Sequence, residues 1–383
     1  MAELVLGSYL FRYPLGGMAS WVLQYLEGFA RLGHRVTFVE AADHHGACFD
    51  VATGTMGDDP TPGIASIRPH LERIGLGDRW CMVDVHGTHH GLSDRALRAA
   101  FARADAFFDM GTHGAFEAHA AVSGTRVLLD GEPGFTQVRL ERARRAGAPA
   151  PAYDHHVTNG ANIGRAGCDV PTAGRRWLHA WHPVVTERVV VHPPPTGAPF
   201  TTLMNWRSHR EVELDGARYG QKDRSFVAFA DLPSRTSVPL ELAVAGLDEG
   251  SAAELATAGW RLRAGHDVSR TVEDFEAHVR ASAGEIAICK HAFVAHRTGW
   301  FSDRSAAYLA AGRPVVFQDT GLADHLPTGE GLLLARDAGE AAESLERIAA
   351  EPERHARAAR RIAEAELDVS VVLPRLLRAL GVA

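Results

Sequence analysis

Apolar and polar positions change their spacing twice near the start of the chain. Residues 4–6 form a continuous apolar run, whereas the apolar residues between 18 and 29 recur every three or four positions, as on one face of a helix. Gly33 ends this helical pattern, and residues 35–39 return to a strand-like apolar run. The order strand, helix, strand predicts a parallel sheet with a right-handed crossover.

The same alternation continues along both halves of the chain. In the first half it predicts strands over residues 81–85, 106–110 and 126–129, and helices over 94–104 and 115–122. In the second half it predicts strands over 201–206, 260–263, 285–289 and 314–317, and helices over 252–258, 272–281, 302–311, 338–350 and 354–366. The last helix has an apolar stripe, from Val372 to Leu380, that must dock on another part of the protein.

A proline-rich stretch separates the two halves. A chain of 383 residues suits two domains better than a single core. We therefore expect an α/β fold with two Rossmann-like doubly wound domains, residues 1–182 and 200–383, joined by a linker over 183–199. The two domains should face a central cleft, and the last helix is expected to pack back toward the first domain.

Composition restricts the classes of function. The net charge of −7 and the pI near 6.3 oppose a nucleic-acid groove, which requires a basic excess. The sequence contains no apolar run of about 18 residues, so we expect no integral membrane segment. The N-terminus lacks the basic and apolar regions of a signal peptide, and the 4 cysteines include no CxxC pair. A cytoplasmic protein is expected.

Residues 302–304 combine three features of an anion-binding site. Ser302 can cap the predicted helix, Asp303 can bind hydroxyl groups, and Arg304 can hold a phosphate with a forked pair of donors. The unpaired N–H groups of the helix start and the positive end of the helix dipole also attract phosphate. This stretch predicts a site for a diphosphate attached to a sugar or a ribose.

Five further positions in the second half are candidates for the same site. Thr320 and Gly321 follow one buried strand, and Lys290 follows another. Lys222 lies in the run Gly-Gln-Lys-Asp-Arg, and Glu330 lies in Thr-Gly-Glu-Gly. Basic side chains can neutralise a departing diphosphate without a metal ion, and a carboxylate such as Glu330 can bind a ribose.

Loops of the first half supply candidates for the reacting end of the site. The Gly16-Gly17 loop can bring backbone N–H groups close to an acceptor or a phosphate. A group that removes a hydroxyl proton should also come from this half, at the end of a predicted strand. The candidates for this general base are His86, His113, Asp130 and Glu132.

The histidine-rich segment that contains His86 also raises a different class, a metallohydrolase. Asp84, His86, His89 and His90 carry side chains that ligate zinc or iron. Their spacing matches no familiar ligand motif, however, and adjacent residues at the end of a strand point in opposite directions. We therefore expect no metal site and no cofactor.

The chain resembles glycosyltransferases of the GT-B type, which are built from two Rossmann-like domains. The resemblance is carried by residues 299–321, followed by 326–333, and by the opening run Gly16-Gly17, helix, Leu-Gly-His, strand. The chain further resembles a set of bacterial glycosyltransferase-like proteins with the runs GQKDR, NIG and SGWFSDR, the last of which reads TGWFSDR here. The resemblance implies that residues 302–304 and 320–321 hold a nucleotide-sugar donor, of which UDP-sugars are the commonest in this fold.

One departure from the family pattern affects the stereochemistry. Retaining members often carry two glutamates at positions that correspond here to Gly299 and Ala307, and Asp303 is the nearest acidic substitute. Retention of configuration therefore does not follow from the resemblance, and the sequence also leaves the oligomeric state open.

The most consistent interpretation is a metal-independent hexosyltransferase. It would move a sugar from a nucleotide-diphosphate sugar to a small-molecule or natural-product acceptor. Two alternatives remain: a sugar-nucleotide epimerase with the same fold, and a degenerate, non-catalytic partner protein that keeps the fold.

Overall fold

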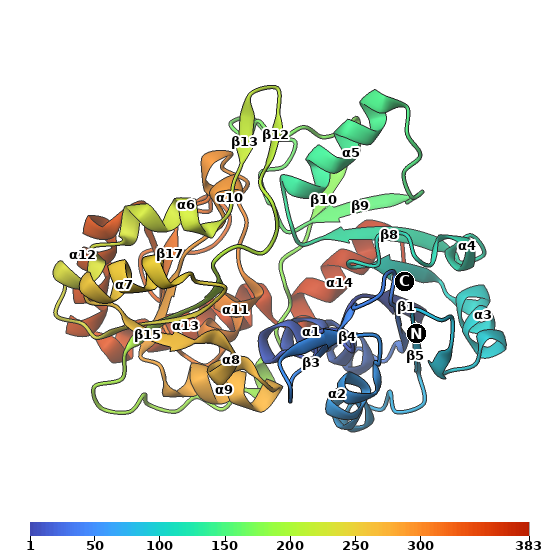
Figure 1. Ribbon diagram of the computed structural model, residues 1–383, viewed down its shortest axis with the longest axis horizontal. Helices are drawn as coiled ribbons and strands as arrows, with labels where there is room; N and C mark the ends of the chain where they lie inside the picture. Colours follow the sequence, from blue (N-terminus) through green and yellow to red (C-terminus); the bar gives the residue numbers. More distant parts are fainter. Residues whose placement is uncertain (383) are drawn as a thin grey trace.

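Two parallel β-sheets, one from each half of the chain, form the framework of the computed structural model, which describes residues 1–382 (Figure 1). The first sheet has, in spatial order, β10 (Trp177–His179), β9 (His155–Thr158), β8 (Thr125–Asp130), β7 (Ala106–Asp109), β1 (Glu3–Gly7), β2 (Arg35–Ala41), β5 (Trp80–Val83) and β6 (His89–Gly91). The second has β15 (Arg261–Ala264), β14 (Leu240–Ala245), β11 (Phe200–Asn205), β16 (Gly284–Ala287), β17 (Val315–Gln318) and β18 (Leu332–Ala335).

The order of strands reverses once in each sheet. All neighbouring pairs are parallel except β5 and β6. The chain proceeds outward from β1 toward β5 and then returns to the other side of β1 at β7, and the second sheet repeats this between β11 and β16. Both sheets are therefore doubly wound, as predicted, and each has a switch point at which ligands commonly bind.

Helices cover both sheets. Those of the first half are α1 (Gly16–Arg31), α2 (Thr61–Arg73), α3 (Asp94–Arg103), α4 (Glu117–Ala120) and α5 (Phe135–Ala146). Those of the second half are α6 (Lys222–Phe226), α7 (Glu249–Thr257), α8 (Gly265–Ser269), α9 (Val272–Ala281), α10 (His291–Ala295), α11 (Asp303–Ala310), α12 (Ala338–Ala350), α13 (Pro352–Ile362) and α14 (Val369–Leu380). Ser93, Asp248, Thr271, Ser302, Asp337 and Asp368 cap α3, α7, α9, α11, α12 and α14 with their side chains.

Two small hairpins, two 3₁₀ turns after α6 (Val227–Phe229 and Leu232–Ser234) and one irregular connection complete the described chain. β3 (Cys48–Asp50) pairs with β4 (Thr55–Gly57), and β12 (Val212–Leu214) pairs with β13 (Ala217–Tyr219). Between β10 and β11 the chain forms only a short 3₁₀ turn, Thr186–Arg188. This connection contains the proline-rich stretch that separates the two sheets.

The last helix returns to the first half of the protein (Figure 1). A π-helical turn, Ala363–Leu367, redirects the chain after α13, and α14 packs against α1. The contact is close because a Cβ at Gly28 would lie 2.6 Å from Leu373 Cδ1 and from Val369 Cγ1. The apolar stripe from Val372 to Leu380 is accordingly buried in this contact and in the adjoining cores.

The predicted elements differ from the observed ones mainly where the sequence lacks a clear period. The strands predicted from apolar runs are present with shifts of at most two residues at their ends. The helix predicted over 115–122 shrinks to α4. Elements that the sequence did not predict are α2, α5, α6, α8, α10, β3, β4, β6, β9, β10, β12, β13, β14 and β18. Within residues 1–382, no helix combines the length and the apolar character that crossing a bilayer requires.

Candidate functional site

The carboxyl ends of both sheets border the candidate site. In the second half, the switch point lies between β11 and β16. The chain leaves β16 and reaches Lys290 at the start of α10, and it leaves β11 through the β12–β13 hairpin and reaches Lys222 at the start of α6. The topology therefore brings two lysines from distant parts of the sequence to one crevice.

Lys290 forms an ion pair with Glu132, which belongs to the other sheet. The Lys290 Nζ donates to Glu132 Oε1 at 2.7 Å and to Oε2 at 2.6 Å. Glu132 lies in the loop after β8, so this contact spans the space between the two sheets. Burial opposes the ionisation of Glu132, but the charge of Lys290 and the nearby His209 outweigh it and lower the pKa of Glu132 to about 2.

Lys222 is the least compensated cation of the site. Its side chain is buried, with 8% of the residue exposed, and within residues 1–382 its amine has no carboxylate partner. Burial, followed by the charge of Arg304, lowers the pKa of Lys222 to about 7. A bound anion stabilises the charged form of such a buried amine, because it compensates a positive charge that the protein itself does not pair.

The start of α11 holds Ser302, Asp303 and Arg304 as the sequence predicts. The Ser302 hydroxyl accepts the backbone N–H of Arg304 at 3.2 Å and thereby caps the helix. The Arg304 guanidinium, however, donates to the buried carboxylate of Glu285 on β16. Arg304 is therefore held by the protein itself, beside Lys222, instead of projecting freely toward a ligand.

Asp303 faces the first half of the protein. Burial raises the pKa of Tyr9 and Tyr25, and the Asp303 carboxylate adds to both shifts. Burial also lowers the pKa of His182, and Asp303 opposes that shift. A carboxylate in this position, opposite polar side chains of the other sheet, is suited to bind the hydroxyl groups of a ligand between the two halves.

Thr320 and Gly321 lie in a contact between the two halves, where most of their polar groups are already bonded. The Thr320 hydroxyl donates to the Trp300 carbonyl at 2.8 Å, and the Gly321 N–H donates to Asp319 Oδ1 at 2.8 Å. Asn162, from the run NIG of the first half, covers this turn and donates to the Gly321 carbonyl at 3.0 Å. Asn162 thus joins Gly321 to the first half, whereas the Thr320 hydroxyl and carbonyl bond within the second half and, within residues 1–382, the Thr320 backbone N–H has no partner.

The structure separates Glu330 from the rest of the predicted site. Glu330 precedes β18 and so lies at the amino ends of the strands, on the opposite edge of the sheet from Lys222 and Lys290. Its carboxylate pairs with Arg354 of α13. Residues before and after a strand lie at opposite edges of the sheet. The position of Glu330 was therefore not predictable without β18, which the apolar pattern does not indicate as a strand.

Gly16 and Gly17 also serve a contact between the halves. The Gly17 N–H donates to the Ser269 hydroxyl of α8 at 3.0 Å. A Cβ at Gly16 would lie 2.0 Å from the carbonyl oxygen of Thr271, so the start of α1 approaches the second half as only glycine permits. The loop therefore packs against α8 and α9 and is closed on that side.

The four candidates for a general base are dispersed, and Glu132 alone among them reaches Lys290. His86 is exposed on the turn between β5 and β6, near His45 at the edge of the sheet. His113 binds Arg139, with 3.0 Å between its Nδ1 and the guanidinium, and burial followed by Arg139 lowers its pKa. No group of three or more potential metal ligands occurs within residues 1–382, so the histidine-rich segment forms no such cluster.

Asp130 positions the loop that carries Glu132. Its buried carboxylate accepts hydrogen bonds from Gln137 Nε2 at 2.8 Å and from the Thr158 hydroxyl at 2.9 Å. It also accepts the backbone N–H of Glu132 at 2.9 Å. The oxygens of Asp130 are therefore occupied by groups of the protein, and the carboxylate holds the loop that carries Glu132.

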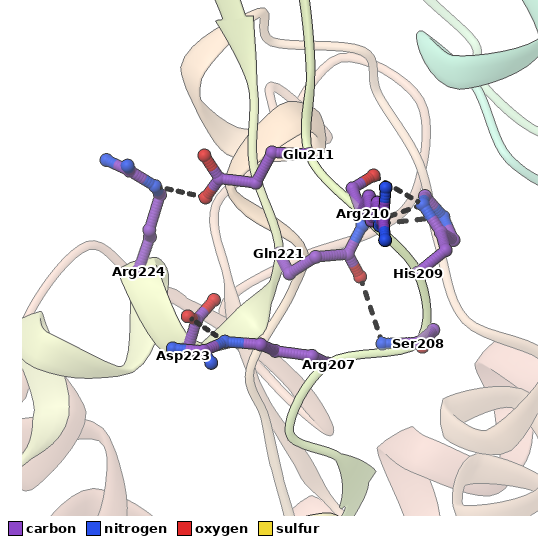
Figure 2. A pocket seen from close by; sticks show the side chains of 8 residues that line it. All are labelled: Arg207, Ser208, His209, Arg210, Glu211, Gln221, Asp223 and Arg224. Carbon is purple, nitrogen blue, oxygen red and sulfur yellow. Dashed lines mark hydrogen bonds and ion pairs between the residues drawn. The ribbon is translucent and has the colours of Figure 1, made fainter.

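A pocket of about 590 Å³ adjoins this site, and most of its residues are not among those predicted from the sequence. It lies beside α6 and the β12–β13 hairpin, and Figure 2 shows the side chains around it. They are Arg207, Ser208, His209, Arg210, Glu211, Gln221, Asp223 and Arg224. His209 connects the pocket to the lysine site, because its Nε2 lies 3.4 Å from Lys290 Nζ and 3.6 Å from Glu132 Oε2. The run GQKDR, noted in the sequence, was the available signal for this region.

No family model matches the chain, and no curated sequence matches it significantly. Solved structures do share its fold over nearly the whole length. Anabaena HepE in complex with UDP and glucose has a TM-score of 0.58 at 13% identity, with 100% of both chains covered. An α-glucosyltransferase in complex with UDP and DNA has a TM-score of 0.60 at 12% identity, covering 99% of this chain and 98% of the other.

A third structure extends the comparison. S. aureus TarM in complex with fondaparinux, α-GlcNAc-glycerol and UDP has a TM-score of 0.56 at 7% identity, with both chains covered completely. At such low identities the likeness concerns the fold. It confirms the class inferred from the sequence, two doubly wound α/β units arranged as in GT-B glycosyltransferases.

Proposed function

We propose that this protein is a glycosyltransferase that takes a sugar from a UDP-sugar. The observation that carries the proposal is the position of Lys222 and Lys290, two buried amines at the switch point of the second sheet. A diphosphate is the ligand that best suits this pair, because Lys222 has no carboxylate partner within residues 1–382. UDP is the proposed nucleotide because HepE, the α-glucosyltransferase and TarM all have UDP bound.

The reaction would break the bond between the sugar C1 and the diphosphate oxygen and form a bond from C1 to an acceptor oxygen. Negative charge develops on the diphosphate as it leaves, and the ammonium groups of Lys222 and Lys290 would neutralise it without a metal ion. The proton of the acceptor hydroxyl must pass to a base, and Glu132 is the candidate that the fold brings to the lysines. Asp303, at the start of α11 in the second half, would bind sugar hydroxyl groups.

A small-molecule acceptor is part of the proposal. The pocket beside α6 has a volume typical of small-molecule sites and communicates with the lysines through His209. The solved structures with this fold were determined in complex with molecules as different as DNA and fondaparinux, so the fold itself does not choose the acceptor.

The decisive experiment is calorimetric titration with UDP, GDP, TDP, ADP and CMP, followed by turnover assays with the matching sugar nucleotides. We expect UDP to bind the wild-type protein, and Lys222→Met and Lys290→Met each to weaken binding at least about tenfold, or by about 1.4 kcal/mol. Absence of binding by every nucleotide would overturn the proposal. A new sugar nucleotide formed from the donor alone would indicate an epimerase, and binding without turnover would indicate a non-catalytic protein.

A further inference from the structure

The pairing of Glu132 with Lys290 is built by both halves of the protein. Asp130 accepts the backbone N–H of Glu132 and is itself held by Gln137 and Thr158, so the loop presents the carboxylate in a fixed direction. On the other side, Lys290 follows β16 and is 5% exposed. Both carboxylate oxygens lie within 2.7 Å of the amine. This is a well-formed bidentate contact between two fixed supports.

The surroundings of Lys290 leave few directions for an anion to approach. The rings of Phe135 and Phe293 lie 5.4 and 5.9 Å from the Nζ, measured to the ring centres. His209 lies 3.4 Å away on a further side. An ammonium group has three donors, of which two point to the Glu132 oxygens and the third is within reach of His209 Nε2. A phosphate oxygen that binds Lys290 must therefore take the place of the carboxylate.

Resting on the function proposed above, we propose that Glu132 is an internal competitor of the donor diphosphate. In the closed contact its carboxylate occupies the anion position at Lys290. A diphosphate that enters takes this position, and the Glu132 side chain is released toward the acceptor side of the cleft. Donor binding therefore releases Glu132 in the same step. In this way the substrate itself regulates the site.

The distribution of charge in the cleft supports this exchange. Glu285 pairs with Arg304, and Glu132 pairs with Lys290, whereas within residues 1–382 no carboxylate forms an ion pair with Lys222, on which Glu285 acts only weakly. Lys222 therefore attracts the diphosphate first, and the exchange at Lys290 follows. While it is paired, Glu132 has a pKa near 2 and is a poor proton acceptor; release from Lys290 removes the main cause of that lowered pKa.

The exchange has a measurable consequence for affinity. When only a fraction of the molecules is unpaired, the apparent dissociation constant rises by the inverse of that fraction. If the pair is closed in about nine molecules of ten, removing the competitor should improve affinity about tenfold. A residue that only contacts the donor would behave in the opposite way, because its removal would weaken binding.

The test compares Glu132→Gln with the wild type in calorimetric titrations with UDP, inorganic pyrophosphate and uridine. Glutamine keeps the size of the side chain and removes its charge. We expect UDP and pyrophosphate to bind about tenfold more tightly to the variant and uridine to bind equally to both, because the competition concerns the diphosphate alone. Unchanged or weaker binding of UDP by the variant, with normal binding by the wild type, would overturn the competitor while leaving the proposed function intact.

A matched control separates this effect from a general loosening between the halves. Glu273 of α9 pairs with His70 of α2 at 3.6 Å, which also joins the two halves but lies on other elements. Glu273→Gln should leave UDP affinity unchanged. An equal gain in Glu273→Gln would overturn the specific competition, and failure of UDP to bind the wild type and both variants would overturn the proposed function itself.

Discussion

Arg304 on α11 donates to the carboxylate of Glu285 on β16, and the two side chains are 14% and 0% exposed. The pair ties the start of the helix to the strand that leads to Lys290. The pair also affects how substitutions at Arg304 are interpreted. Removing a charge that is buried with its partner destabilises the protein, whereas removing a charge that only contacts a ligand weakens binding.

Arg304→Ala is expected to lower the free energy of unfolding by about 3–5 kcal/mol, because the substitution leaves a buried carboxylate without its partner. Chemical denaturation would measure the loss. The double variant Arg304→Met, Glu285→Gln should recover most of the stability, since it removes both charges together. If Arg304→Ala is as stable as the wild type, the pair does not contribute as described, and any loss of UDP binding would then point to direct contact.

The affinity for UDP-glucose should fall as the pH rises from 6 to 9. Burial lowers the pKa of Lys222 to about 7, so the amine is charged below this pH and neutral above it, and the diphosphate binds the charged form. UDP-glucose is the appropriate probe because its diphosphate has no terminal phosphate group that titrates near neutral pH.

Lys222→Arg serves as the control for this pH dependence. A guanidinium stays charged throughout the range, so its variant should bind UDP-glucose with a much flatter profile. The same slope in Lys222→Arg and in the wild type would show that another group, and not Lys222, controls the pH response.

Much of the fold could be predicted from the sequence because its helices and strands have distinct periods. The predicted helix over 272–281 coincides with α9, and Ser302 caps α11 as its position before a run of small residues indicates. α5 was missed because five of its twelve residues are charged and its apolar face is short. β9 was missed because its two histidines break the apolar run that indicates a buried strand.

The site was harder to predict because its important relationships join residues far apart in sequence. Lys290 and Glu132 were each identified from their positions after strands, but no local pattern shows that they pair with each other. Thr320 and Gly321 follow a strand at the predicted edge of the sheet, and Asn162 from the other half donates to the Gly321 carbonyl there, which no local pattern shows. Glu330 was misplaced because a single unrecognised strand puts it on the opposite edge.

Asp130→Asn is expected to reduce stability by about 1–3 kcal/mol, because an amide group would face donors that now bind a carboxylate. The loop with Glu132 would also lose its fixed position, so nucleotide affinity should change in the same variant. Thermal unfolding and UDP titration would measure the two effects. A variant with wild-type stability and no activity would instead indicate that Asp130 itself takes part in the reaction.

Gly28→Ala should destabilise the contact of α1 with α14. The added methyl group would lie 2.6 Å from Leu373 Cδ1 and Val369 Cγ1, so the two helices must move apart or their side chains must shift, at a cost of about 1–3 kcal/mol. Gly250→Ala in the exposed turn of α7 is the control, and it should be neutral or stabilise by up to about 1 kcal/mol through helix propensity. Equal effects of the two substitutions in chemical denaturation would contradict the close packing. Because α14 belongs to the end of the chain and α1 to its beginning, a loss at Gly28 alone would show that the last helix holds the first half of the protein in place.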